Sequence, residues 1–211
     1  MTGSISSMRL DEIERETNTA VFCYGRINPP TLGHQKLIHK GRQVAEEVGG
    51  DFFVFPTHSH TPKKKPTENL NPLDLETKMR FLNEVFPEVE FVPEHSQTLF
   101  GALFWLLEQG YNRAYMVTGS DRVETFRETI FNYVPYKNPD VDPEKAVDFE
   151  FFEVINAGER DPDSQGVEGA SGSKARQYVI EGKINKFRSI VPGKAKTKTA
   201  LYKAVKKGLG V

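Results

Sequence analysis

Short apolar runs rich in β-branched and aromatic residues alternate along the chain with longer segments of helical periodicity. This alternation is typical of a parallel β-sheet covered by α-helices. The apolar runs predict strands over residues 19–25, 51–57, 89–93, 113–119 and 148–155. The order of the elements predicts an α/β fold with a doubly wound, five-stranded parallel sheet and C-terminal helices.

Helical spacing of apolar residues predicts a helix that begins near His34 and ends at Gly49-Gly50. Further helices are predicted over residues 73–86, 98–109, 123–131, 173–181 and 198–207. The leucine stripe between Leu99 and Leu107 is expected to face the core. Cys23, in the first strand, is expected to be a small buried apolar residue.

The composition fits one globular domain of ordinary size. The chain has 211 residues, of which 37% are hydrophobic and 27% charged, and its single cysteine rules out an internal disulfide. The longest apolar stretch, residues 100–107, is far shorter than the roughly 20 residues that cross a bilayer. Because residues 1–18 also lack the apolar middle of a secretory signal, we expect a soluble, cytoplasmic protein in a reducing compartment.

Charge is balanced overall but unevenly distributed. The net charge of -1 gives no global electrostatic argument for binding nucleic acid or an anionic membrane. Residues 182–211, however, contain nine Lys or Arg and no acidic residue. We therefore expect a main domain over residues 19–192 and a basic, helical C-terminal tail over residues 193–211.

The first candidate binding residues lie in the turn after the first predicted strand, GRINPPTLGH (residues 25–34). Ligands of doubly wound sheets bind beyond the carboxyl ends of the strands, near the point where the strand order reverses. Thr31 can cap the following helix, whose free N–H groups and dipole attract an anion. His34 is expected in the first helical turn, facing the same anion, where it can donate a hydrogen bond to a phosphate oxygen. The alternative is an ordinary histidine at a helix N-terminus.

Two later turns carry complementary polar groups. TGSDR (residues 118–122) follows the fourth strand, and its Asp121 either contacts a nucleotide or only caps the next helix. ASGSKAR (residues 170–176) opens a late helix, where Ser171 or Ser173 can act as a cap. Arg176, one turn in, is expected on the phosphate-binding face.

Two sequence motifs of this chain together resemble a known pair of motifs. They are Thr31-Leu32-Gly33-His34 and Ser171-Gly172-Ser173-Lys174-Ala175-Arg176. They are similar to the (His/Thr)-x-Gly-His and (Ser/Thr)-x-(Ser/Thr)-x-x-Arg motifs that define the cytidylyltransferase-like nucleotidyltransferase superfamily. The resemblance covers residues 21–192 and implies its Rossmann-like nucleotidyltransferase fold. Within it, residues 58–80 and 175–192 look most similar to the archaeal-type nicotinamide mononucleotide adenylyltransferases.

This resemblance implies transfer of AMP from ATP to a phosphorylated acceptor such as nicotinamide mononucleotide, with release of pyrophosphate. By the same resemblance, His34 and Thr31 stabilise the α-phosphate, and Arg176, with Ser171 and Ser173, holds the β- and γ-phosphates. Further nucleotide-binding residues are expected to be Gly25, Arg26, Gly33, Gly119 and Asp121. Contacts to phosphate or acceptor are expected from Lys63, Lys64, Lys78 and Arg80, although Lys63 to Lys65 are also compatible with a solvated surface.

Mg²⁺ is expected on the triphosphate, held mainly by phosphate oxygens and water, so the protein needs no dedicated set of metal ligands. His58 and His60 do not complete a zinc site. The expected partners are a nucleoside triphosphate and a small phosphorylated acceptor, without a membrane. A homo-oligomer is compatible with these features.

Two other functions stay open at the level of the sequence. A CTP-dependent cytidylyltransferase with an alcohol-phosphate acceptor would use the same fold. A non-catalytic nucleotide-binding or nucleic-acid-binding module would use the basic C-terminal segment to contact a phosphate backbone.

Overall fold

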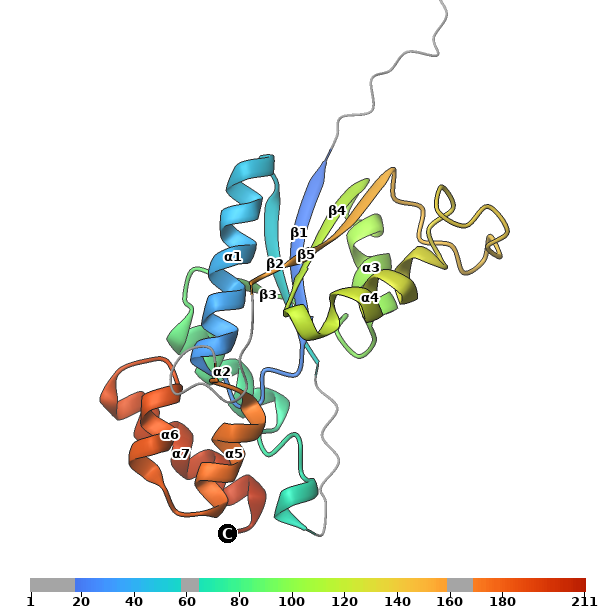
Figure 1. Ribbon diagram of the computed structural model, residues 1–211. Coiled ribbons are helices and arrows are strands. Elements are labelled where there is room, and N and C mark those ends of the chain that lie inside the picture. Colours follow the sequence, from blue (N-terminus) through green and yellow to red (C-terminus); the bar gives the residue numbers. More distant parts are fainter. Residues whose placement is uncertain (1–17, 58–64, 159–168) are drawn as a thin grey trace, which may run out of the picture.

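A parallel β-sheet forms the centre of the molecule (Figure 1). The computed structural model describes residues 18–57, 65–158 and 169–211. Within them the five strands lie in the order β3-β2-β1-β4-β5, and every pair of neighbours is parallel. The strands are β1 (Thr19–Gly25), β2 (Asp51–Pro56), β3 (Glu90–Phe91), β4 (Arg113–Thr118) and β5 (Phe151–Asn156). The predicted doubly wound sheet is therefore confirmed.

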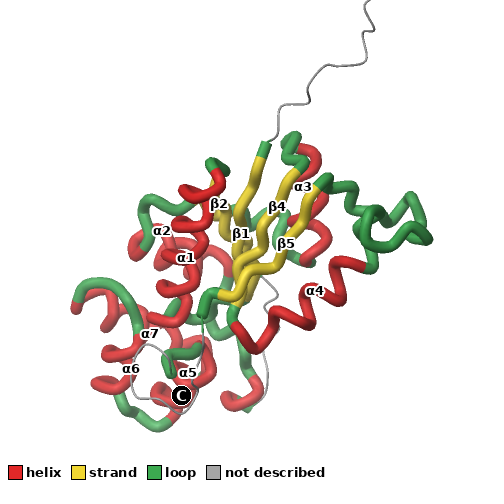
Figure 2. The backbone as a smooth tube through the Cα atoms, turned by 45° about the horizontal axis from the view of Figure 1, so that its top comes forward, coloured by secondary structure: helices red, strands yellow, loops and turns green. Residues whose placement is uncertain are grey.

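Helices cover both faces of the sheet, as the tube view in Figure 2 shows. Helices α1 (Leu32–Val48) and α2 (Leu75–Val85) lie on one face, and α3 (Leu99–Glu108) and α4 (Val123–Phe131) lie on the other. The chain ends in α5 (Gly172–Ile180), α6 (Ile184–Ile190) and α7 (Ala195–Leu209). Two short 3-10 turns, η1 (Pro66–Glu68) and η2 (Ser120–Arg122), complete the described elements. None of the described helices is long and apolar enough to span a membrane.

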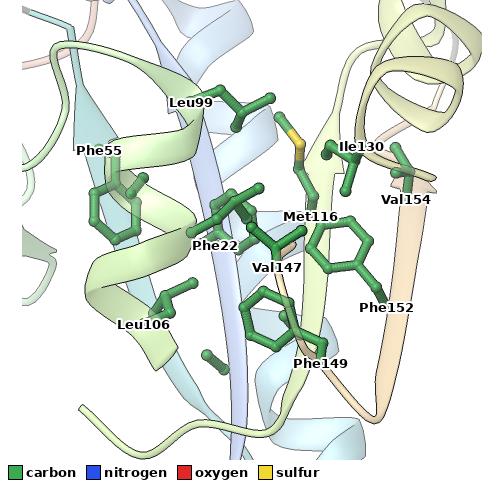
Figure 3. Packing of buried hydrophobic residues seen from close by; sticks show 14 of the residues in the cluster. Phe22, Phe55, Leu99, Leu106, Met116, Ile130, Val147, Phe149, Phe152 and Val154 are labelled. Atoms are coloured by element: carbon green, nitrogen blue, oxygen red, sulfur yellow. The ribbon is translucent and has the colours of Figure 1, made fainter. Parts of the chain in front are cut away.

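Alternate side chains of β1 enter two different cores, as expected for a strand covered on both faces. Val21 and Cys23 pack toward α1 and α2, whereas Ala20 and Phe22 pack toward α3 and α4. Figure 3 shows the second core, in which Phe22 lies among residues from α3, β4 and β5. The predicted burial of Cys23 is confirmed. In the stripe on α3, the buried residues are Leu99, Ala102, Leu103 and Leu106.

The three C-terminal helices share a third apolar cluster with Leu73, which precedes α2, and with Phe81, on the inner face of α2. In Figure 1 these helices lie beside the start of α1. Helix α7 begins three residues earlier than the predicted start at residue 198. The proposed boundary of the main domain at residue 192 stays a prediction.

The differences from the predicted elements are local. Helix α6 was not predicted, because a seven-residue helix gives too short a periodic pattern. The edge strand β3 spans two residues rather than five and pairs with β2 only at Phe53 and Val54. Strand β5 begins at Phe151 rather than at residue 148.

Candidate active site

A cavity of about 240 Å³ lies at the carboxyl ends of β1 and β4, between the first turns of α1 and α5. This is the point at which the strand order reverses, where ligands of this fold class bind. The cavity brings together most of the residues singled out in the sequence, namely Gly25, Arg26, Thr31, Gly33, His34, Gly119, Asp121, Ser173 and Arg176. The two motifs therefore meet in space, although more than 100 residues separate them in the sequence.

The motifs approach each other closely because Gly33 has no side chain. A Cβ atom at this position would lie 2.3 Å from the carbonyl oxygen of Ala170, which no real contact permits. Beside it, the buried hydroxyl oxygen of Thr31 lies 3.2 Å from the same carbonyl oxygen. Gly33 and Thr31 thus hold the start of α1 against the residues that lead into α5.

Hydrogen bonding fixes the orientation and the tautomer of His34. Thr31 is the N-cap residue of α1, and His34 is the third residue of the helix. The Nδ1 atom of His34 accepts a hydrogen bond from the backbone N–H of Thr31 at 3.1 Å and lies 2.8 Å from its hydroxyl oxygen. Because Nδ1 accepts an N–H, it carries no hydrogen in the neutral ring, and Nε2 is the donor nitrogen. His34 can therefore present an N–H to an anion in the cavity.

Arg176 is a buried cation held by uncharged oxygen atoms. Its Nη1 donates to the backbone oxygen of Asn28 at 2.7 Å, and its Nη2 donates to the hydroxyl of Ser173 at 3.0 Å. Burial, together with the nearby charge of Arg26, lowers the pKa of Arg176 to about 10. The guanidinium stays protonated at neutral pH, so the cavity holds a positive charge that an anion can neutralise.

Two more guanidinium groups line the same cavity. Burial and the charge of Arg122 lower the pKa of Arg26. The nearest Arg122 and Asp121 side-chain atoms of opposite charge lie 4.0 Å apart, in a solvent-exposed pair. Sequence reasoning missed Arg122, although it directly follows Asp121 in the TGSDR turn. It also missed Lys36, which lies on α1 two residues beyond His34 and lines the cavity.

Of the three residues considered as helix caps, Ser171 occupies a cap position, whereas Ser173 and Asp121 do not. Ser171 is the N-cap of α5, and its hydroxyl accepts a hydrogen bond from the N–H of Lys174 at 3.1 Å. Ser171 is absent from the described residues that line the cavity, whereas Ser173 lines it. Asp121 lies in η2 and is not the N-cap of α4, since that position belongs to Arg122.

The side chains of Lys78 and Arg80 lie outside the cavity lining. Lys78 is buried on the inner face of α2, where its Nζ donates to the backbone oxygens of Thr57 and, at 3.4 Å, of Arg26. Arg80 is exposed, and its guanidinium lies 4.8 Å from the centre of the Phe81 ring. The contacts proposed for both residues stay predictions. Those proposed for Lys63 and Lys64, and the histidines His58 and His60, fall outside the described residues.

The burial of Lys78 predicts a rise in stability at alkaline pH. Burial lowers the pKa of Lys78 in the folded protein to about 8, whereas in the unfolded chain the lysine keeps its ordinary, higher value. Above pH 8 the unfolded chain therefore binds more protons, and the free energy of unfolding increases with pH. We expect Lys78→Met to remove a gain of about 1–2 kcal/mol between pH 7.5 and 9.5, measured by urea unfolding.

The exposed Lys203 on α7 supplies the control for this measurement. Lys203→Met should retain the pH dependence of the wild-type protein. If Lys78→Met and the wild type gained the same stability over this interval, the buried ammonium group would not be its source.

The described cavity lining offers few oxygen ligands to a metal ion. Among the described residues, no group of three or more His, Cys, Asp or Glu side chains could hold a metal ion. Of the described residues that line the cavity, Asp121 is the one carboxylate. A Mg²⁺ ion bound here would therefore take most of its ligands from phosphate and water.

The chain shares its fold with adenylyltransferase structures. No protein-family model and no curated protein sequence matches it. It is similar to the Plasmodium falciparum nicotinic acid mononucleotide adenylyltransferase complexed with NaAD, with a TM-score of 0.57 and 14% sequence identity over 89% of this chain and 95% of that one. The same enzyme complexed with APC gives a TM-score of 0.56, with the same identity and coverage. The expected Rossmann-like fold is thereby confirmed.

Proposed function

We propose that the protein is a nucleotidyltransferase that transfers AMP from ATP to a phosphorylated acceptor, such as nicotinamide mononucleotide, and releases pyrophosphate. The observation that carries this proposal is the meeting of His34 and Arg176 in one cavity at the switch point of the sheet. The shared fold with an adenylyltransferase from Plasmodium falciparum supports it.

The reaction is a displacement at the α-phosphorus. An oxygen of the acceptor phosphate forms a bond to that phosphorus while the bond to the β-phosphate bridging oxygen breaks. Both reactants are anions, so catalysis requires that the site hold them together and neutralise the charge that builds up on the five-coordinate phosphorus. No covalent enzyme intermediate is needed.

His34 is the group proposed to act at the α-phosphate. Its Nε2–H would donate to a non-bridging oxygen, in a bond that strengthens as negative charge accumulates. Thr31 would act through His34, because its backbone N–H bonds to Nδ1 and keeps the ring in the donor tautomer. The N–H groups at the start of α1, near Gly33, would add to this stabilisation.

Arg176 and Ser173 are proposed to hold the β- and γ-phosphates, which leave as pyrophosphate. The N-terminus of α5, capped by Ser171, adds its dipole to this binding. Arg26 and Arg122 would contribute further positive charge. Gly25, Gly119 and Asp121 would lie against the sugar or the base.

Bound Mg²⁺ would supply neutralisation of charge on the phosphate oxygens. Such an ion would take most of its ligands from phosphate and water.

Two mononucleotides are candidates for the acceptor. Nicotinamide mononucleotide follows from the resemblance of the sequence. The structural neighbour complexed with NaAD makes nicotinic acid mononucleotide a second candidate. Nicotinamide mononucleotide carries an amide where nicotinic acid mononucleotide carries a carboxylate. Competition between the two acceptors in one assay shows which of them the protein prefers.

The proposal is tested by following the α-phosphate. The protein is incubated with Mg²⁺, either acceptor and ATP labelled at the α-phosphorus, and we expect the label in a dinucleotide together with one pyrophosphate per product. ATP labelled at the γ-phosphorus should place its label in pyrophosphate alone. Transfer from labelled CTP to an alcohol phosphate would instead identify a cytidylyltransferase. If no donor released pyrophosphate, the proposed activity would be wrong.

A further inference from the structure

Asn28 is a buried residue of the loop between β1 and α1, and it bonds to a distant part of the chain. Its side-chain Nδ2 donates to the backbone oxygen of Leu73 at 2.8 Å, and its Oδ1 accepts from the backbone N–H of Leu73 at 3.1 Å. The amide thus pairs with both backbone groups of one residue, as a neighbouring strand would. This paired contact fixes the position of Asn28 relative to the segment that leads into α2.

The backbone of Asn28 in turn supports the buried guanidinium. Its carbonyl oxygen accepts the 2.7 Å hydrogen bond from Nη1 of Arg176. A Cβ atom at Gly172 would lie 3.2 Å from Nη1 and 3.4 Å from this carbonyl oxygen, so the backbone of α5 packs directly against the contact. The guanidinium is therefore enclosed between the carbonyl of Asn28 and the first turn of α5.

The segment of residues 26–28, which carries this carbonyl, depends on contacts with other parts of the chain to keep its backbone conformation. Ile27 has a φ of 45°, in the left-handed region that a β-branched residue rarely adopts. Two side chains hold the segment: the Asn28 amide through Leu73, and Lys78 through the backbone oxygen of Arg26. Without such contacts the loop would relax toward a more favourable conformation and move the carbonyl.

We propose that Asn28 is a positioning residue, whose amide contact with Leu73 aims the Arg176 guanidinium at the β- and γ-phosphates of the nucleotide. This inference rests on the proposed function and deepens it, because it names the group that holds the phosphate-binding arginine in place. Asn28 acts through Arg176 rather than on the reacting atoms.

Asn28→Ala removes both side-chain hydrogen bonds without adding charge. Because Arg176 then loses its fixed carbonyl partner, we expect the dissociation constant for ATP to rise about 10-fold. The dissociation constant for AMP, which lacks the two outer phosphates, should stay within about 2-fold. Titration calorimetry with the full chain measures both. The KM for ATP should rise in parallel, with a smaller change in kcat.

Asn69 supplies a matched control, because it is equally buried and also binds backbone. Its Nδ2 donates to the oxygen of Gly208 at 2.9 Å, and its Oδ1 accepts from the N–H of Asn71, away from the cavity. Asn69→Ala should lower the melting temperature but leave the ratio of ATP to AMP affinity unchanged. Asn28→Ser, which keeps a hydroxyl, serves as the second variant if Asn28→Ala does not fold.

The measurements test the role of Asn28 and the proposed activity separately. A selective loss of ATP affinity in the Asn28 variants, absent from Asn69→Ala, supports the inference. Equal losses for ATP and AMP, or the same loss in Asn69→Ala, would overturn it. If the wild-type protein bound ATP but transferred no AMP, the proposed function would fail while the affinity ratio still decided the role of Asn28. If it bound no ATP, both would be wrong.

Discussion

His34→Ala is expected to lower kcat for AMP transfer by about 100-fold or more, the scale of losing one donor to a transition-state charge. The structure gives the reason, because Nδ1 of His34 is occupied by the N–H of Thr31 and Nε2 is thereby the donor nitrogen. Pyrophosphate release at saturating ATP and acceptor measures the effect. The KM for ATP should change less than kcat, because the lost bond is strongest in the transition state.

His39 lies on the exposed side of the same helix and provides the comparison. His39→Ala should keep the wild-type kcat. Thermal unfolding of His34→Ala must also be followed, since the variant loses part of the N-terminal cap of α1, worth about 1 kcal/mol. A folded His34→Ala protein with unchanged turnover would contradict the role given to the imidazole.

Gly33→Ala is expected to have an effect of similar size through a different cause. The added Cβ would lie 2.3 Å from a backbone oxygen, that of Ala170, so the start of α1 and the lead-in to α5 must separate. A displacement of about 1 Å between catalytic groups can cost about 100-fold in rate. We therefore expect a loss of about 100-fold in kcat/KM for ATP, measured by the same assay.

Gly101→Ala in α3 is the control for this substitution. Its Cβ would approach the oxygen of His95 at 3.0 Å, which a small shift can relieve, and α3 lies away from the cavity lining. Its activity should match that of the wild type. Wild-type activity in Gly33→Ala would mean that the close meeting of the two motifs does not matter for the reaction.

The chain's hydrophobic pattern was sufficient to predict most of the fold. The strand at Thr19–Gly25 was predicted with its observed bounds, because a buried parallel strand reads as a continuous apolar run between turn residues. The short α6 and the two-residue β3 were not predicted correctly, since neither is long enough to establish a period. Their positions depend on packing against helices and strands distant in the sequence.

The meeting of the two motifs in one cavity was predictable for a related reason. Thr31 and His34 are the N-cap and the third residue of α1, and Arg176 is the fifth residue of α5. Helix geometry at these positions determines where their side chains point. Asn28 could not be found in this way, because its partners are the backbone of Leu73 and the side chain of Arg176. Only the folded chain brings these groups together.

Helix phase accounts for the different positions of Lys78 and Arg80. Lys78 lies three and four residues before the buried Phe81 and Leu82, and thus on the inner face of α2. Arg80 lies on the outer face. The resemblance implied contacts to phosphate or acceptor for both residues. The periodicity of α2 distinguishes the buried residue, Lys78, from the exposed one, Arg80.

The proposed phosphate site is best examined in a crystal structure of the protein with an ATP analogue that cannot be cleaved between the α- and β-phosphates. We expect Nε2 of His34 at about 3 Å from a non-bridging oxygen of the α-phosphate, with the Arg176 guanidinium on the β- or γ-phosphate. A triphosphate bound elsewhere on the protein, or bound in the cavity with its base against Arg176, would contradict this expectation.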